Sequence, residues 1–368
     1  MDPTLPAVDE LGPVRVVGLR DLASTLDAVI VVDNTALGRA LGGVRMARDV
    51  TAAECARLAR AMTLKNAAAG LAHGGGKAVI AADPALPAAD KERIVRRFAA
   101  LIEHELDFIP GPDMGTDETC MAWIRDEIGR AAGLPEELGG IPLDRLGATG
   151  FGLAHAVAVA VEHCGFELSG ARVVVQGFGA VGKHAARFLR DRGAVLVGAS
   201  DSQGSVHDAR GLDVDALARA KSEGKSVAEH GAGEAGDRDA VLDIECDIWI
   251  PAARPDVVTE ANVHRLKAKL VAEGANLPLT AGAERALGER GVLVLPDFIA
   301  NAGGVIAAAV ELRGGSADEA FEAIERKIRT NTQRVLTAAR EAGVGPREAA
   351  VALAEGRVRA AMGYRRWR

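Results

Sequence analysis

The sequence predicts an α/β protein of two domains, the second of which is a doubly wound parallel sheet. Two observations support this fold class. At 368 residues the chain is longer than a single hydrophobic core usually serves, so two domains are expected. After Gly147, short apolar segments typical of buried strands alternate with helical segments, which is the pattern of a parallel sheet with crossover helices. The expected domains are residues 1–145, completed by a C-terminal helical segment 331–368, and residues 146–330.

The first domain mixes strand and helix signals. Residues 28–32 (AVIVV) form a short apolar run, and residues 78–82 (AVIAA) form another that ends at an Asp-Pro turn. Thr51 to Glu54 has the form of a capping box, which predicts a helix through about residue 69. Further helices are expected over residues 91–106 and after Thr116.

The second domain shows regular alternation. A helix over 151–164 leads to a strand at 172–176, and a glycine turn then starts a helix to 192 and a strand at 195–200. The later expected elements are strands at 247–251, 270–272 and 292–295, an exposed loop at 229–239, and a helix to 342 opened by a capping box at 316–319.

Composition excludes several classes of protein. The net charge is −7, from 44 basic and 51 acidic residues, so neither nucleic acid nor another polyanion is an expected partner. No window approaches 18 consecutive apolar residues, and residues 1–10 lack the basic start and apolar core of a signal peptide. We therefore expect a cytoplasmic protein without a membrane partner.

No metal site is expected from the sequence. The four cysteines are far apart in the chain and form no C-x-x-C pair, which predicts buried free thiols rather than zinc ligands or disulfides. His155 and His163 lie on an alanine-rich helix without acidic or cysteine partners nearby, so they are not expected to bind a metal.

Residues 177–182 read GFGAVG between a buried strand and a helix. In this context Gly177 permits a tight turn, Gly179 lets the main chain approach a pyrophosphate, and Gly182 lets the helix pack against the strand. Asp201 closes the next strand, at the position where an acidic residue accepts hydrogen bonds from the adenosine ribose. The segment predicts a Rossmann-like dinucleotide site.

The cofactor expected from Asp201 is NAD, because a carboxylate would repel the 2′-phosphate of NADP. Ser202 could donate a hydrogen bond to that phosphate, so NADP stays open.

Three ionisable residues stand out in the first domain. HGGGKA places Lys77 after three glycines, but a P-loop would need glycine where Leu71 stands and a hydroxyl residue at Ala78. Lys65 lies in an apolar helical segment, where a charge is costly without an anionic partner. Asp113 lies in the Pro- and Gly-bounded segment IPGPDMGT. Taken singly, each has an ordinary explanation, as a surface lysine or a turn aspartate.

Seven motifs recur in this order in the glutamate/leucine/phenylalanine/valine dehydrogenase family, and the sequence resembles that family from about residue 25 to 342. They are LGGVRM (41–46), MTLKNAAAGL-x-x-GGGK (62–77), GPDMGT (111–116), ATGFG (148–152), VQGFGAVG (175–182), EGAN (273–276) and PDFIANAGGV (296–305).

The resemblance implies reversible oxidative deamination of an L-amino acid to a 2-oxo acid and ammonium, with NAD or NADP accepting the hydride. Lys65 would pair with the substrate α-carboxylate. Lys77 would activate the attacking water, for which desolvation and a nearby cation would have to lower its pKa. Asp113 would exchange a proton with the amino group. Gly42 and Gly43 would bind the substrate, and Asn301 would lie near both substrate and nicotinamide. The cofactor-binding residues implied are Gly177, Phe178, Gly179, Ala180, Val181, Gly182, Asp201, Ser202, Thr149, Ala252, Asn276 and Asn301.

The resemblance also bears on the substrate side chain. Glutamate-specific members carry a lysine where this chain has Leu41, before Gly42 and Gly43, and a serine where it has Ala308. A buried γ-carboxylate without these partners is unfavourable, so we expect an apolar substrate, with Leu41, Ala308 and Val305 lining its pocket.

Two alternatives remain. The second domain resembles that of glutamate dehydrogenases, and Arg39 could supply the missing charge. A non-catalytic dinucleotide-binding sensor is the alternative of another class, against which Lys65, Lys77 and Asp113 argue. The family forms homo-oligomers, and its cleft between domains is expected to close over the substrate.

Overall fold

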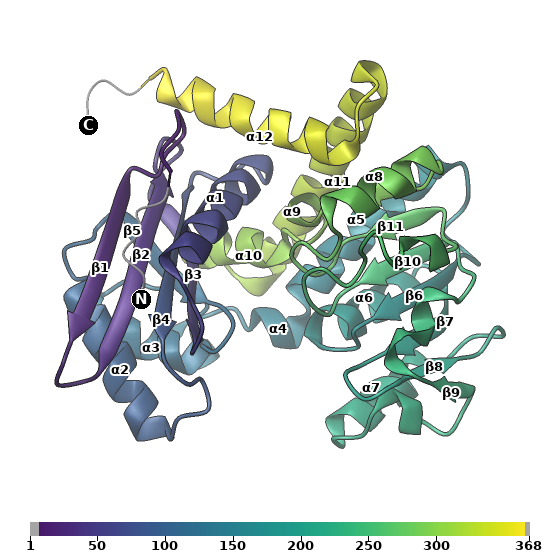
Figure 1. Cartoon of the computed structure of the whole chain (residues 1–368), viewed down its shortest axis with the longest axis horizontal. Helices are drawn as coiled ribbons and strands as arrows, with labels where there is room; N and C mark the ends of the chain where they lie inside the picture. Colours follow the sequence, from purple (N-terminus) through teal and green to yellow (C-terminus); the bar gives the residue numbers. More distant parts are fainter. Residues whose placement is uncertain (1–6, 365–368) are drawn as a thin grey trace. The chain divides into compact units, whose positions relative to one another are not determined.

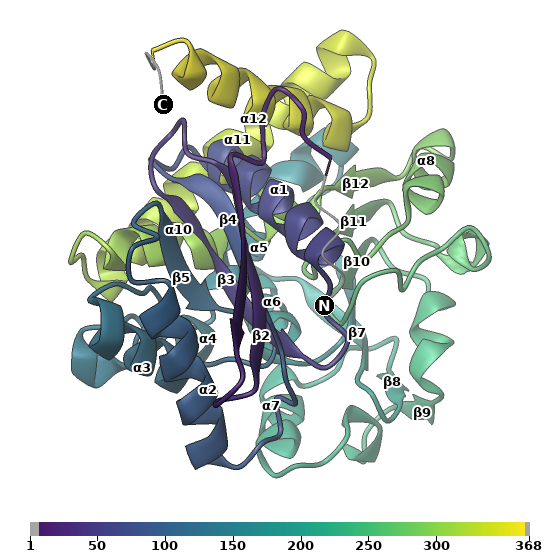
Figure 2. The ribbon, with the colours of Figure 1, turned by 60° about the vertical axis from the view of Figure 1, so that its left-hand side comes forward.

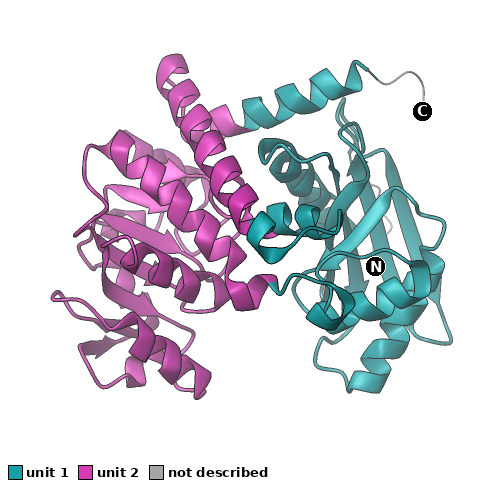
Figure 3. Cartoon of the chain, turned by 180° about the vertical axis from the view of Figure 1, so that it is seen from behind, with its two compact units in different colours: residues 1–142, 305–320, 351–368 teal, residues 143–304, 321–350 magenta. Residues whose placement is uncertain are grey.

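Two sheets organise the chain, one in each of two units (Figure 3). The computed structural model describes residues 7–364, so the first six residues of the segment examined for a signal peptide and the last four of the C-terminal helical segment lie outside it. Unit 1 comprises residues 1–142, 305–320 and 351–368, and unit 2 comprises residues 143–304 and 321–350.

These units differ from the expected domains in the C-terminal third. Residues 305–320 group with unit 1, and residues 331–350 group with unit 2. Three helices cross the divisions: α10 (Gly303–Glu311), α11 (Ala317–Ala342) and α12 (Pro346–Met362) each contribute residues to both units. Helical periodicity identifies such helices but does not say against which core each half packs.

Unit 1 is built on a mixed five-stranded sheet in the order β1-β2-β4-β3-β5. β1, β2 and β4 pair antiparallel, whereas β3 is parallel to both β4 and β5. The strands are β1 (Arg15–Asp21), β2 (Leu26–Asn34), β3 (Ala40–Ala47), β4 (Gly74–Ala81) and β5 (Phe108–Pro112).

Both faces of this sheet are covered, as the strand period of two requires. Val29 and Val31 of β2 pack in a cluster with α1 (Ala52–Ala68). On the opposite face of the same strand, Ala28, Ile30 and Val32 pack with α2 (Ala88–Leu101) and α3 (Glu118–Ile128). Figure 2 shows α1 lying across the sheet. The helix starts at Thr51, whose hydroxyl accepts a hydrogen bond from the Glu54 N–H as predicted.

The glycine run 74–76 is part of strand β4, which therefore begins four residues before the expected strand at 78–82. Its main chain pairs with β2 and β3. Strands β1, β3 and β5 were not predicted either, because glycine, proline and charge interrupt their apolar pattern.

Unit 2 is built on a seven-stranded sheet in the order β12-β11-β10-β6-β7-β8-β9, parallel except for β8 and β9 (Figure 1). The predicted doubly wound α/β sheet is confirmed. Trp249, Val174, Val271 and Val294 form a buried row across four neighbouring strands. The strands are β6 (Arg172–Gln176), β7 (Val195–Ser200), β8 (Ser205–His207), β9 (Glu234–Gly236), β10 (Ile248–Pro251), β11 (Leu270–Ala272) and β12 (Leu293–Leu295).

The remaining helices of unit 2 connect these strands. They are α4 (Leu143–Leu146), α5 (Ala148–Cys164), α6 (Ala180–Arg190), α7 (Val214–Ser222), α8 (Ala281–Glu289) and α9 (Asp297–Ala300). The expected loop 229–239 is exposed but contributes β9, which pairs with β8. The second capping box is confirmed, since Ser316 N–H donates to Glu319 and Glu319 N–H donates back to the Ser316 hydroxyl. Within residues 7–364, no helix has the length and apolar character needed to span a membrane.

Candidate active site

Three neighbouring strands of unit 1 bring Lys77 and Asp113 together. Leu41 pairs with Gly75 and Val44 with Ala78, which sets Gly43 of β3 level with Lys77 of β4. On the other side Gly43 pairs with Gly111 of β5, and Asp113 follows the end of that strand. The Lys77 Nζ lies 2.9 Å from Asp113 Oδ2, and the lysine side chain is only 7% exposed. The structure thus joins two residues that the sequence singled out separately.

Gly43 makes room for this ion pair. A Cβ at this position would lie 2.7 Å from the Asp113 Cβ and 3.1 Å from the Lys77 Nζ. Both distances are shorter than ordinary contacts, so any side chain at residue 43 would displace the pair. The motif GGVR therefore needs glycine at its second position for a reason that only the tertiary contact reveals.

Arg45 completes the cluster, although no role was predicted for it. Its Nε lies 2.9 Å from Asp113 Oδ2 and its Nη1 lies 2.7 Å from Glu54 Oε1. Burial by itself raises the pKa of Asp113, but the Lys77 and Arg45 cations outweigh it and hold the pKa below its ordinary value. The signal that could have found Arg45 is its spacing, since residues 43 and 45 of one strand face the same side.

Lys65 lies half-buried on α1, which Asn66 ties to the sheet. The buried Asn66 amide donates to the main-chain carbonyls of Leu41 (3.1 Å) and Gly74 (2.7 Å). This link fixes the helix that carries Lys65 against the strands β3 and β4. Asn66 is a second residue for which no role was predicted.

The residues expected to line the side-chain pocket all belong to unit 1. Leu41 is 3% exposed and Ala308 is 9% exposed, and Val305 is half-buried. Arg39, the alternative source of positive charge, is exposed, and its Nε donates to the Leu106 carbonyl at 2.6 Å. That hydrogen bond holds the Arg39 guanidinium at the surface.

In unit 2 the glycine turn has the form that a dinucleotide requires. Gly177 has φ of +94°, and a Cβ there would lie 2.7 Å from Ala253. A Cβ on Gly182 would lie 2.0 Å from the Gly177 carbonyl oxygen, so this glycine allows α6 to pack closely. Gly179 is exposed, with nothing within 4 Å of a Cβ position, which leaves the start of α6 open to an anion. Phe178 is buried, and its N–H donates to the Ser200 carbonyl at 2.8 Å.

Buried polar atoms near the carboxyl ends of these strands lack partners. The Gln176 Oε1 and Ser200 Oγ have no hydrogen bond within the described residues, nor does the Asn301 Oδ1. The Asn301 amide donates to the Asn276 Oδ1 at 3.0 Å, which brings these two predicted residues together. Buried groups of this kind are normally paired, so the arrangement fits a bound ligand with polar groups of its own, as a dinucleotide has.

Thr149 and Ala252 also lie in this part of unit 2. The Thr149 Oγ1 is 3.2 Å from the position that a Cβ on Gly304 would take. Ala252 directly follows β10 and donates its N–H to the Gln176 carbonyl at 2.7 Å.

Asp201 is occupied by internal donors. Its carboxylate, 7% exposed, accepts hydrogen bonds from the Lys221 Nζ (2.8 Å), the Ser226 hydroxyl (2.9 Å) and the Val227 N–H (2.9 Å). Burial alone raises the pKa of Asp201, but these donors and the Gln203 N–H lower it to about 2. Because Lys221 neutralises this carboxylate, the repulsion of a 2′-phosphate on which the preference for NAD rested is weakened. Ser202 is exposed beside it.

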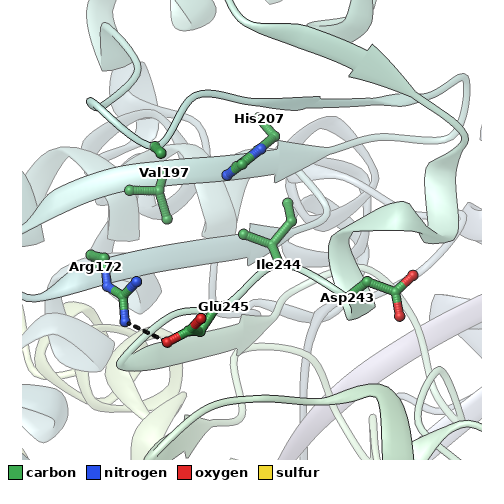
Figure 4. Close-up of a pocket in the computed structure, with 7 residues that line it drawn as sticks. Arg172, Val197, His207, Asp243, Ile244 and Glu245 are labelled. Carbon is green, nitrogen blue, oxygen red and sulfur yellow. Dashed lines mark hydrogen bonds and ion pairs between the residues drawn. The ribbon is translucent and has the colours of Figure 1, made fainter.

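A cavity of about 370 Å³ lies elsewhere in unit 2 (Figure 4). Arg172 on its wall is paired with Glu245 at 3.5 Å. No residue predicted to bind substrate or cofactor lines it; the lining residues are Arg172, Val197, His207, Ala209, Asp243, Ile244 and Glu245.

No metal centre is formed by the described part of the chain, where no group of three or more His, Cys, Asp or Glu side chains could hold an ion. The four cysteines are free thiols, of which Cys164 is only partly buried.

Comparisons with known proteins agree with this architecture. Residues 15–130 match the family model "Glu/Leu/Phe/Val dehydrogenase, dimerisation domain", and residues 139–366 match "Glutamate/Leucine/Phenylalanine/Valine dehydrogenase". A glutamate dehydrogenase from Aeropyrum pernix is 39% identical over 358 residues, covering 91% of this chain and 85% of the relative. Other relatives are named as NADP-specific or NAD-specific glutamate dehydrogenases.

Two solved structures share the whole fold. The Leu-bound form of hetero-hexameric glutamate dehydrogenase from Thermus thermophilus superposes with a TM-score of 0.87 at 31% identity, covering 97% of this chain and 91% of that one. L-tryptophan dehydrogenase from Nostoc punctiforme gives 0.74 at 26% identity, covering 96% and 98%. The expected family, fold and NAD(P)-dependent amino-acid dehydrogenase class are confirmed. The chain therefore belongs to the glutamate/leucine/phenylalanine/valine dehydrogenase family.

Proposed function

We propose that this chain catalyses the reversible, NAD(P)-dependent oxidative deamination of an L-amino acid to its 2-oxo acid and ammonium. The observation that carries the proposal is the buried Lys77–Asp113 ion pair, 2.9 Å long and flanked by Arg45. A base and a proton-exchanging acid in contact are what deamination of an amino acid requires. A catalytically silent sensor would have no need of this pair.

The roles of the unit 1 residues follow from their chemistry. Lys65 binds the substrate α-carboxylate through its ammonium group. In its neutral form, after losing its own proton, Lys77 takes a proton from the water that attacks the imine, and Asp113 exchanges a proton with the leaving amine. In unit 2 the main chain of residues 177–182 holds the pyrophosphate, and Thr149, Ala252, Asn276 and Asn301 hold the nicotinamide end. When bound, the nicotinamide supplies the acceptor for the hydride from the substrate Cα.

L-Glutamate is the first candidate substrate. Relatives of this chain over most of its length are named glutamate dehydrogenases, and such similarity of a whole chain favours a shared substrate. The same relatives include NADP-specific and NAD-specific enzymes, and the neutralised Asp201 supports use of both cofactors. We also propose a homo-oligomer, since unit 1 matches a model described as a dimerisation domain.

An apolar L-amino acid is the second candidate, because a specific observation favours it. Leu41 and Ala308 are buried and apolar, so they offer no partner to a substrate γ-carboxylate. Contacts with the side chain of the substrate set specificity more directly than the scaffold does.

A panel of L-amino acids assayed at alkaline pH with NAD and with NADP tests the function and separates the two candidates. A kcat/KM for glutamate about 100-fold above that for leucine, valine and phenylalanine supports the first candidate, and the reverse ratio supports the second. Lys77→Ala should keep its affinity for NADH but lose about a thousandfold in turnover, because the base is gone. Absence of turnover with every amino acid, alongside NADH binding, would instead favour the sensor.

A further inference from the structure

The ionic cluster of unit 1 contains Lys77, Asp113, Arg45 and Glu54. Neither the sequence motifs nor the proposed reaction gives Arg45 a role. We propose that Arg45 is a positioning residue for Asp113, holding its Oδ2 so that Oδ1 is the oxygen that exchanges a proton with the substrate amino group. This inference rests on the proposed function and names one more residue of the same site.

The first argument is the unequal treatment of the two carboxylate oxygens. Asp113 Oδ2 accepts from both Lys77 Nζ and Arg45 Nε, each at 2.9 Å. Within residues 7–364 no group donates to Oδ1. Two charge-assisted hydrogen bonds from different directions fix the plane of the carboxylate. Oδ1 is therefore the oxygen left for proton exchange.

The main chain beneath this carboxylate is fixed as well. Asp113 N–H donates to the Thr116 hydroxyl at 3.0 Å, and that hydroxyl donates to the Val44 carbonyl at 2.7 Å. Val44 precedes Arg45 on β3, so the turn after β5 and the arginine are held by one strand. With the main chain and Oδ2 both held, the position of Oδ1 is determined.

Arg45 itself is held by Glu54 at the start of α1. The Glu54 Oε1 lies 2.7 Å from Arg45 Nη1, so its carboxylate reaches the arginine, while its N–H remains bonded to the Thr51 hydroxyl. A guanidinium presents five donors in a rigid planar fork, whereas the three donors of an ammonium rotate on a flexible stem. An arginine is therefore needed to hold Asp113 and be held by Glu54.

The charges around Asp113 set the expected pH dependence. The groups facing it are Lys77 on β4, Arg45 on β3 and, beyond Arg45, Glu54 on α1; the neighbouring Cys55 thiol is neutral because burial raises its pKa to about 12. Lys77 and Arg45 both favour the ionised carboxylate. Removing Arg45 therefore raises the pKa of Asp113, and its ionised form is lost at a higher pH.

Arg45→Met and Arg45→Lys, compared with wild type, test the proposal through kcat and through the pH at which the Asp113 carboxyl is half ionised. This midpoint should move up by about one pH unit in Arg45→Met, the size of shift that a nearby opposite charge causes. The kcat of Arg45→Met should fall about tenfold or more, because Asp113 is no longer oriented. Arg45→Lys keeps the charge and should return the midpoint towards wild type while kcat stays low. A folded Arg45→Met variant with an unmoved Asp113 midpoint would overturn the proposal.

Two further measurements keep this result interpretable. Glu54→Gln leaves the charge of Arg45 in place, so it should lower kcat without moving the Asp113 midpoint upward; an upward shift as large as that of Arg45→Met would contradict the assignment. A carboxyl ¹³C NMR titration, with the Asp113 signal assigned through Asp113→Asn, follows the same ionisation without turnover. If wild type does not deaminate amino acids, the proposed function fails, yet an Asp113 midpoint that does not rise in Arg45→Met would still refute the role of Arg45.

Discussion

Single residues in unit 1 show how a charged group can be buried without being isolated. Lys77 and Arg45 share one carboxylate oxygen of Asp113, and Glu54 balances the second cation. Two cations and two anions make the cluster neutral, which reduces the cost of burying each of them. In unit 2, the Asp201 carboxylate already accepts hydrogen bonds from Lys221 and from a main-chain N–H. An acidic residue at the ribose-binding position of the sequence therefore does not by itself show that its carboxylate is available to a ribose.

Leu41→Lys tests the pocket at this scale. The change introduces the charge that a γ-carboxylate needs, so kcat/KM for glutamate relative to leucine should rise by about 10- to 100-fold. Steady-state kinetics with both substrates measures the ratio, and Leu41→Met, of similar volume and uncharged, is the control. An unchanged ratio in a folded Leu41→Lys enzyme would place residue 41 outside the pocket.

At the scale of elements, the glycines of β3 and β4 serve the packing of the protein itself as well as the site. The family resemblance implies that Gly42 and Gly43 bind the substrate, and Gly43 does leave room for the ion pair of the site. A Cβ on Gly75, however, would lie 2.0 Å from the Thr63 main-chain nitrogen, and one on Gly74 would lie 1.9 Å from the Asn34 carbonyl oxygen. These glycines let α1 and β2 approach β4 closely, which fixes the helix that carries Lys65.

Gly75→Ala should therefore destabilise the protein by about 3 kcal/mol or more, since the methyl group meets rigid main chain rather than a movable side chain. Gly356→Ala is the matched control: this exposed glycine of α12 has nothing within 4 Å of its Cβ position, and alanine should stabilise the helix by about 0.5–1 kcal/mol. Urea unfolding of both variants measures the difference. Equal stability of the two would refute the close contact of α1 with β4.

At the scale of the whole molecule, α12 joins unit 2 through a buried ionic cluster. Arg347 at its first turn contacts Glu273 after β11 (2.5 Å), Glu284 on α8 (2.6 Å) and Asp297 on α9 (3.0 Å). One guanidinium faces three carboxylates, and Glu273 is fully buried. Burial, helped by the neighbouring Asp297 and Glu284, raises the pKa of Glu273 to about 8 against the opposing effect of Arg347.

The sign of the resulting pH dependence follows from linkage. Glu273 holds a proton in the folded protein up to about pH 8, whereas in the unfolded chain it loses it near pH 4.3. The contribution of this group to stability therefore falls as pH rises between these values. Glu273→Gln, which mimics the protonated form, should lose less in Tm between pH 6 and pH 9 than wild type. Calorimetry at both pH values measures this, with exposed Glu289→Gln as control; an equal loss in all three would contradict the raised pKa.

The sequence located much of unit 2 because its signals are local. The strand at 172–176, the glycine turn and the start of the following helix depend on residues adjacent in the chain, and all three lie where predicted. The order of the motifs along the chain identified the family, and with it Lys77 and Asp113. This inference also needs no knowledge of which residues are in contact in the folded protein. The expected strand 78–82 was only half of β4, because a run of three glycines has no apolar signal and enters the sheet through main-chain pairing alone.

The sequence by itself determined the fold class, the family and the presence of a dinucleotide turn, since these follow from periodicity and from residue types at fixed short spacings. Only the tertiary structure decided that Arg45 holds Asp113 across 68 residues of chain, that Asp201 is bound internally, and that α11 and α12 each serve both units. Ion pairs and close main-chain contacts depend on which distant segments the sheet places side by side, and no local pattern in the sequence records that.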